Sequence, residues 1–347
     1  MLVLLPGALY AILLAESARR GNFAIDLNQT LLPAAETLSR GDTPYPAYGY
    51  PPLVVFGLLP FAFLPAADVL FVALLLGALP LALWLFGVRD WRCYAAAFLW
   101  APTFHAVQTG NVSILLLLGL AFCWRYRESP VALTIGGGLT IAAKIICWPL
   151  ALWLAATRRY RGALGAVICS LVVTFGLWGT LGFSGLLRYP SNLDRLSTQV
   201  SPDSYTLKAM VVDFGASPAI GRILGILLIL AVLALCVAAG RRGDDRRAFA
   251  FAVFATIVAS PIVWLHSFVL LLAVVAIFRP RLSFVWFAPC LLWAASGNGN
   301  GAPWQTVLVL AVALAVSVVC LFPRSNDRER RRVVVSEPAS FPGSAGV

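Results

Sequence analysis

The sequence predicts an all-α polytopic membrane protein. Of its 347 residues, 60% are hydrophobic and only 12% are charged, which leaves too little polar surface for a soluble globule. A helix needs about 20 consecutive apolar residues to cross the hydrocarbon core of a bilayer. Runs of that length lie at 66–88, 162–182, 219–239 and 303–322.

Shorter apolar runs are joined by polar or proline-containing corners. They are 92–107 with 111–124, 130–143 with 145–157, 247–261 with 265–278, and 282–295. Each is either a short or tilted crossing or part of a re-entrant pair shielded by protein, and length alone does not decide between these. Counting every run gives about 12 transmembrane or re-entrant helices.

The net charge of +11 is explained by topology. The arginines fall in short clusters between apolar runs and form no single basic face, so we expect no nucleic-acid partner. Basic residues are retained on the cytoplasmic side of short loops. That rule places both termini inside, together with the loops at Arg89/Arg92, Arg125/Arg127, Arg158/Arg159/Arg161, Arg241/Arg242/Arg246/Arg247 and Arg279/Arg281.

We expect one transmembrane domain over 1–322 and a basic, disordered cytoplasmic tail over 323–347. The first run, 1–15, is short for a crossing, which favours a truncated or late-assigned start. Two outer loops, at about 17–65 and 183–217, are too long to be simple turns. Within the first loop, residues 51–65 are expected to lie in or dip into the outer interface.

Asp26, in FAIDLNQ, is the candidate catalytic carboxylate of the first outer loop. Transfer of a group to a hydroxyl requires removal of the hydroxyl proton, and a positioned carboxylate can accept it. The alternative is that Asp26 caps a helix formed by LNQTLLPAAETLSRG. Glu36 and Asp42 are rival carboxylates, for which we favour a helix surface and a turn.

Basic side chains on the outer side are candidates for binding a lipid phosphate. Lys144 interrupts an apolar run, so it is paired, snorkels to an interface, or is functional. Arg188 and Arg195 have the same potential, with a solvated loop position as the alternative. Both histidines, His105 and His266, map to the outer level at proline-containing corners, where a hydrogen-bonding core role competes with a functional one.

The sequence predicts neither a metal site nor a cofactor. Seven cysteines are present, odd in number and scattered, and none has a CxxC or CxH spacing. The two histidines are far apart in sequence and offer no metal-ligand spacing.

Several features occur in a recognisable order. The outer Asp26 is followed by GDTPYPAYGYPP, then by PTFHAVQTGN, AAKIICWP, a basic RRYRG loop and SPIVWLH. This order resembles glycosyltransferase family 87, whose members include polyprenol-phosphate-mannose-dependent α-1,2-mannosyltransferases and arabinofuranosyltransferases. The likeness extends from about Gly21 to His266.

The resemblance implies a GT-C-type fold with its active site at the outer face of the plasma membrane. The family's catalytic aspartate matches Asp26, and its Tyr-Pro-Pro element matches Tyr50 and the two prolines after it. Its Gly-Gln-Asn corner is matched only in part, by TGN ending at Asn111. Its Ser-Pro-x-x-Trp-x-His element is complete and ends at His266.

The resemblance therefore implies an inverting glycosyltransferase that moves a sugar, mannose by preference, from a polyprenyl-phosphate donor to a glycolipid or glycan acceptor. Membrane lipid is the third expected partner. Asp26 and His266 are the predicted catalytic residues, and Lys144, Arg188 and Arg195 the predicted phosphate ligands. The predicted substrate-binding residues are Tyr45, Tyr48, Tyr50, His105, Gln108, Asn111 and Trp264. The alternatives are an arabinofuranosyltransferase of the same family and a lipid or solute transporter.

Overall fold

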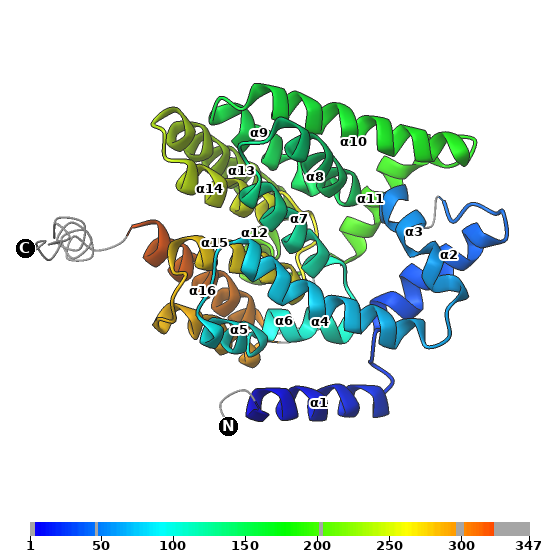
Figure 1. The fold of residues 1–347 in the computed structure, drawn as a ribbon, viewed down its shortest axis with the longest axis horizontal. Helices are drawn as coiled ribbons and strands as arrows, with labels where there is room; N and C mark the ends of the chain where they lie inside the picture. The colour runs from blue at the N-terminus through cyan, green and yellow to red at the C-terminus, as the bar shows by residue number, and fades with distance from the viewer. Residues whose placement is uncertain (1–3, 46–47, 201–203, 296–301, 323–347) are drawn as a thin grey trace, which may run out of the picture.

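A computed structural model describes residues 4–45, 48–200, 204–295 and 302–322 (Figure 1). These residues form helices joined by turns, with no β-strand among them. The tail predicted over 323–347 lies outside the described residues.

Four helices are long and apolar enough to cross a membrane. They are α4 (Ala67–Leu85), α10 (Tyr160–Thr180), α13 (Pro218–Arg241) and α16 (Pro303–Leu321). Each coincides with one of the four long apolar runs, so that prediction is confirmed. Much of their surface faces outward, as expected for helices whose solvent is lipid.

The shorter runs form shorter helices. α6 (Ala101–Thr109) and α7 (Ser113–Arg125) are bent by 117° at their junction, and the described residues contain five candidate spans when this pair is counted as one. The prediction of about 12 crossings remains a prediction. The other short helices are α5 (Trp91–Phe98), α8 (Pro130–Ala143), η3 (Ile145–Cys147), α9 (Pro149–Ala156), α14 (Asp245–Val258), η6 (Leu265–Leu270), α15 (Leu271–Phe278), η7 (Phe284–Trp286) and η8 (Ala288–Ala294).

The predicted first outer loop is largely helical. After α1 (Leu4–Arg19) the chain forms the π-helical turn η1 (Leu27–Leu31) and α2 (Leu32–Ser39), which confirms the helix predicted from LNQTLLPAAETLSRG. The apolar stretch that follows is divided into α3 (Pro52–Leu58) and η2 (Leu59–Phe63). Pro60 and Pro65 limit these helices, because proline lacks the backbone donor of a helix interior.

The predicted second outer loop also contains helices, namely η4 (Leu186–Arg188), α11 (Tyr189–Val200) and α12 (Leu207–Asp213). α12 begins where the Thr206 hydroxyl accepts from the backbone N–H of Ala209 at 3.1 Å. Similar side-chain caps start α8, α13 and α14, from Ser129, Ser217 and Asp244. These caps satisfy helix-end donors that would otherwise lack a partner.

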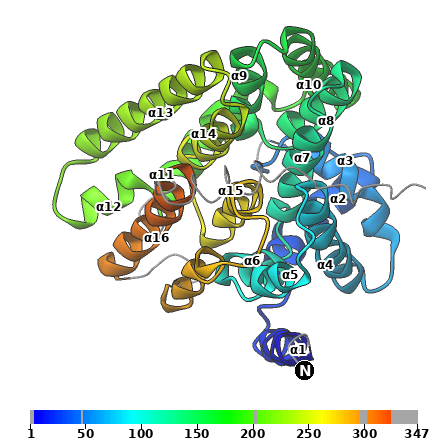
Figure 2. The ribbon, with the colours of Figure 1, turned by 60° about the vertical axis from the view of Figure 1, so that its left-hand side comes forward.

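α8 and α10 lie side by side in both ribbon views (Figures 1 and 2). Glycines allow this approach: a Cβ at Gly138 would lie 2.5 Å from Cβ of Cys169, and one at Gly162 would lie 2.8 Å from Leu133. Small residues let helix backbones approach closely where apolar burial provides no driving force between helices. The TIGGGLT sequence therefore serves helix packing, as its glycines predict.

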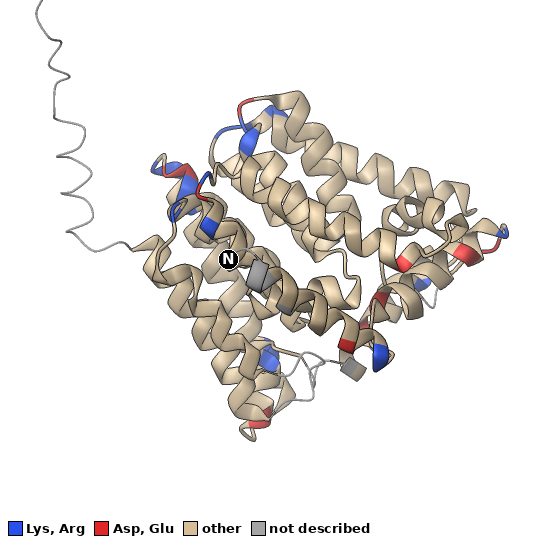
Figure 3. Ribbon diagram, turned by 60° about the horizontal axis from the view of Figure 1, so that its bottom comes forward, with Lys and Arg blue, Asp and Glu red and all other residues tan. Residues whose placement is uncertain are grey.

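Charged residues gather near the ends of the helices, with long uncharged stretches between them (Figure 3). One end holds the arginine-rich turns that follow α4, α7, α9 and α13. Both predicted outer segments lie away from this end, so the charge distribution divides the molecule into an arginine end and an opposite end.

Candidate active site

Asp26 lies at the start of η1, half-buried, at the end of the molecule opposite the arginine turns. Its side chain makes no capping hydrogen bond to the helix that follows, so the capping alternative is not realised. Instead its Oδ2 accepts a hydrogen bond from Nδ2 of Asn111 at 2.8 Å. A π-helical turn beside this residue is a feature often found at functional sites.

The orientation of the Asn111 amide is fixed by Ser113. Asn111 is 1% exposed, and its Oδ1 accepts from the backbone N–H of Ser113 at 3.0 Å and from the Ser113 hydroxyl at 2.7 Å. Its Nδ2 must therefore face the other way. It donates to Asp26 and, at 3.2 Å, to the hydroxyl oxygen of Tyr50.

Gly110 brings the α6–α7 corner against the Asp26 segment. Its φ of +67° is a left-handed conformation that suits glycine. A Cβ at this position would lie 2.9 Å from Cβ of Leu27. Next to it, the backbone N–H of Ala24 donates to the carbonyl of Gln108 at 2.6 Å. The corner and the outer segment are thus joined through the backbone directly beside the carboxylate.

Lys144 supplies positive charge to the same region. It follows α8 in an extended conformation, is half-buried, and its Nζ lies 5.8 Å from the centroid of the Tyr50 ring. This lysine acts electrostatically on Asp26. The extended backbone at Lys144 breaks the apolar run and directs its ammonium toward the Tyr50 side.

The pKa of Asp26 is raised by burial, although hydrogen bonds from Asn111 and Thr109 and the charge of Lys144 oppose the rise. Desolvation disfavours the charged carboxylate, whereas donors and cations favour it. Burial and the nearby Asp26 charge raise the pKa of Tyr50, so its phenol stays protonated. A carboxylate with a raised pKa is a better proton acceptor than an ordinary surface aspartate.

The two histidines lie near this group. His266, in η6, is 5% exposed, and it lies close enough to Lys144 and to His105 for electrostatic interaction. α6, which carries His105, packs against η6. The structure thus brings together the Asp26 cluster, which we define as Asp26, Tyr50, Asn111, Ser113 and Lys144, with His266 and His105 beside it.

Comparison with known families identifies the chain. Residues 48–267 match the model of glycosyltransferase family 87, a segment of 220 residues out of 347. The chain belongs to glycosyltransferase family 87. Comparisons with curated proteins and with solved structures gave no match.

The family 87 segment contains most of the Asp26 cluster but not Asp26 itself. Tyr50, Asn111 and Lys144 lie inside the matched residues, as does His266. Asp26 precedes the match and is linked to it by the hydrogen bond from Asn111. The carboxylate is therefore held by a residue of the family segment.

An aromatic layer supports Tyr50. The Tyr45 hydroxyl donates to the Tyr50 carbonyl at 2.7 Å, and the rings of Tyr48 and Tyr50 are 5.6 Å apart. Tyr45 also packs on Trp178 of α10, with centroids 4.2 Å apart. Tyr189, at the start of α11, donates to the Gly49 carbonyl at 3.0 Å. Residues of both predicted outer loops thus hold the tyrosine segment in place.

Four other predicted site residues make no printed side-chain contact with the Asp26 cluster among the described residues. Arg188 and Arg195 are exposed, and the Arg195 guanidinium donates within its own helix to Asn192 at 2.7 Å and Gln199 at 3.2 Å. Gln108 donates to the Ser17 hydroxyl at 2.9 Å. Trp264 is half-buried immediately before η6. Their predicted substrate roles remain predictions.

Ser113 was missed by sequence reasoning. A serine at the start of an apolar helix is ordinarily a cap or a packing residue, and its contact with the Asn111 amide depends on the turn geometry. The only sequence signal is its position two residues after the asparagine of the family corner. Within the described residues, no group of three or more histidine, cysteine, aspartate or glutamate side chains is arranged to hold a metal ion.

Proposed function

We propose that this family 87 glycosyltransferase moves a sugar from a polyprenyl-phosphate donor to a glycolipid or glycan acceptor, with inversion. Asp26 accepts the proton of the acceptor hydroxyl while the hydroxyl oxygen attacks the anomeric carbon. The bond between that carbon and the phosphate oxygen breaks, and its electron pair leaves with the polyprenyl phosphate. The sugar in this proposal is mannose; arabinofuranose is the other donor sugar used in the family.

The observation that carries the proposal is the oriented contact from Asn111 to Asp26. A carboxylate has about four lone-pair directions, so the hydrogen bonds from Asn111 at 2.8 Å and from Thr109 leave others that can accept a proton. The half-buried position raises the pKa of Asp26 and so strengthens it as a base. A single carboxylate suffices for direct inverting displacement, whereas a glycosidase uses a pair.

Lys144 is the proposed ligand of the leaving phosphate. Its charge acts on the Asp26 carboxylate, and an ammonium at that point would offset the charge that develops on the departing phosphate. His266, beside Lys144, is proposed to orient the phosphate or the acceptor. Arg188 and Arg195 remain further proposed ligands of that phosphate.

The wider proposal is a GT-C-type fold in the plasma membrane with the site on the extracytoplasmic face. The separation of the arginine turns from the Asp26 end favours this orientation, because basic loops are retained inside. A polyprenyl chain stays in the bilayer, so the enzyme has to bind its phosphate at the membrane interface. In this arrangement the shorter apolar helices complete a body of about 12 transmembrane or re-entrant segments.

The test is transfer by the reconstituted protein. Polyprenyl-phosphate-mannose and the arabinofuranose analogue are supplied in separate reactions, and release of free polyprenyl phosphate is measured. Asp26→Asn is expected to lose activity by about 10²-fold to 10⁴-fold, the range supplied by general-base catalysis.

Asp42→Asn is the matched control, because it makes the same chemical change at an exposed carboxylate of the same loop. It is expected to keep wild-type turnover. Near-normal activity of Asp26→Asn in folded protein would remove Asp26 from the mechanism. Release of lipid phosphate from neither donor would overturn the donor class.

A further inference from the structure

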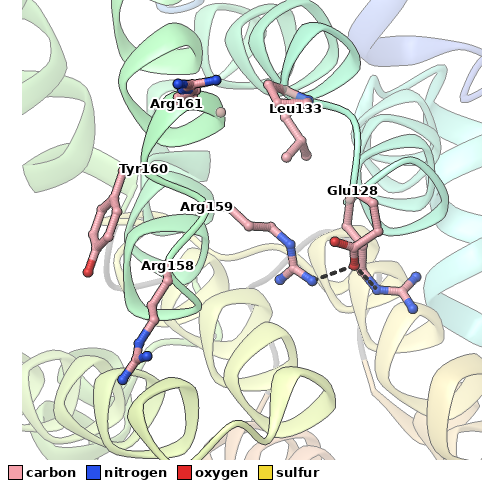
Figure 4. A pocket seen from close by; sticks show the side chains of 9 residues that line it. Glu128, Leu133, Arg158, Arg159, Tyr160 and Arg161 are labelled. Carbon is pink, nitrogen blue, oxygen red and sulfur yellow. Dashed lines mark hydrogen bonds and ion pairs between the residues drawn. The ribbon is translucent and has the colours of Figure 1, made fainter.

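The arginine end contains a pocket that the glycosyltransferase mechanism does not use. Its volume is about 390 Å³, and it lies where α8 and α10 begin. Figure 4 shows Arg159 and Leu133 pointing toward its middle, with Arg161 along its upper edge. Pro130 and Gly162 complete the contact between the two helix starts.

Two of the lining arginines are held by acidic partners. The Arg159 guanidinium bonds Asp245 at 2.9 and 3.1 Å and Glu128 at 2.7 Å. Arg127 pairs with Asp245 at 3.1 Å and lies over the Trp124 ring. These ion pairs join the turn after α7, the N-cap of α10 and the first residue of α14.

Arg158 and Arg161 differ from these two. Both are exposed, and among the described residues neither takes part in an ion pair. The turn therefore carries excess positive charge at the rim of a pocket whose internal charges are already matched. An anion is the complementary ligand.

An apolar strip extends from this pocket along both helices. The exposed large apolar side chains on α8 are Val131, Ile135 and Leu139, four residues apart. Those on α10 are Tyr160, Leu164, Val167, Ile168, Leu171, Val172 and Phe175. Residues four apart share one face of a helix. Because α8 and α10 begin at the same end and pack together, both rows start beside the arginine turn and lead away from it.

We propose that this surface binds an anionic phospholipid. Its headgroup would lie at the turn that carries Arg158 and Arg161, with its phosphate against Arg161 at the pocket edge, and its acyl chains would lie along the apolar rows of α8 and α10. Tyr160 lies between the two arginines in sequence and is 64% exposed, which suits a ring at the headgroup level. A soluble anion would use the arginines but would gain nothing from the apolar strip.

The experiment measures lipid retained by the purified protein. Protein is extracted from vesicles containing equal amounts of phosphatidylglycerol and phosphatidylcholine, and the bound lipids are quantified by mass spectrometry. Wild type is expected to be enriched in phosphatidylglycerol. Arg158→Gln/Arg161→Gln is expected to reduce that enrichment by roughly 30-fold, about fivefold for each arginine near an anionic surface.

Arg222→Gln is the matched control, since Arg222 is an exposed arginine near the start of α13, away from this pocket. It is expected to leave retention unchanged. Equal loss in this control, or full retention by the double variant, would overturn the site.

Two further arms separate the ligand sources. Inorganic phosphate and polyprenyl phosphate are each added during extraction, and displacement of phosphatidylglycerol is measured. Displacement by phosphate at matched concentration would assign the pocket to a soluble anion, and selective retention of polyprenyl phosphate would assign it to donor or product. Either result would refute a phospholipid site, whereas transfer activity in the double variant tests the proposed function separately.

Discussion

The Asn111 amide and the Asp26 carboxylate meet at 2.8 Å although they are 85 residues apart in sequence. One belongs to the α6–α7 corner and the other to the first outer loop. Ser113 fixes which atom of the amide faces the carboxylate. The contact therefore depends both on the local turn that orients Asn111 and on the packing of the α6–α7 corner against the Asp26 segment. Variants of Asn111, Ser113 and Gly110 test these contributions separately.

Asn111→Ala is expected to lower kcat/KM by about 10-fold to 100-fold, the value of a hydrogen bond to a charged group. The same variant removes a donor that lowers the pKa of Asp26, so that pKa rises further. Because the base must be ionised, the acid limb of the pH–rate profile should move to higher pH. The measurement is kcat/KM against pH.

Asn28→Ala is the control for this variant. Asn28 is exposed, and its amide donates only to the Phe23 carbonyl at 3.3 Å, so its profile should match wild type. An unmoved acid limb in Asn111→Ala would mean that Asp26 is not the group that titrates.

Ser113→Ala is expected to reduce activity by roughly fivefold, the effect of about 1 kcal/mol for one neutral hydrogen bond. The backbone N–H of residue 113 still holds Asn111 Oδ1, which limits the loss. Ser113 acts through Asn111, so combining the two changes should give little loss beyond Asn111→Ala alone. Kinetics of the double variant check this; fully additive losses would assign Ser113 a separate role.

Gly110→Ala is expected to destabilise the protein by about 1–3 kcal/mol, because alanine is strained at positive φ and its Cβ would meet that of Leu27 at 2.9 Å. The clash lies beside Asp26, so activity should fall as well. Gly77→Ala, in α4, has open space around the new Cβ and should keep or slightly raise the melting temperature. Thermal unfolding of both variants in the same detergent gives the comparison.

The four long helices were predictable because the signal for a membrane helix is local. The number of crossings was not, because short runs such as those around the α6–α7 corner acquire their direction from tertiary contacts. Both helices have ordinary helical sequences, which do not signal the 117° bend between them. Residue composition gives their length but not the angle between them.

The site was predictable in part for a related reason. Asp26, Lys144 and His266 are polar residues at unusual places in an apolar chain, and such residues are expected to have partners. Arg188 and Arg195 were predicted from their charge alone. The charge of a residue does not indicate whether its side chain points toward the site or into solvent. Ser113 gave almost no signal, since its role depends on one rotamer of its neighbour.

The raised pKa of Asp26 leads to a prediction about stability. The folded protein binds this proton more tightly than the unfolded chain, whose aspartate has a pKa near 3.9. Stability therefore falls as pH rises from that value through the higher pKa of the folded state, and stays reduced above it. At neutral pH the ionised Asp26 carboxylate therefore lowers the free energy of unfolding.

Asp26→Asn removes this titration while keeping an oxygen that can accept from Asn111. We expect the variant to melt at or above the wild-type temperature at neutral pH, although it is inactive, and to match wild type at a pH low enough to protonate Asp26. Thermal unfolding at the two pH values provides the measurement, with Asp42→Asn as an exposed control. A variant that melts well below wild type at neutral pH would show that the ionised carboxylate stabilises the fold, and burial would no longer explain its pKa.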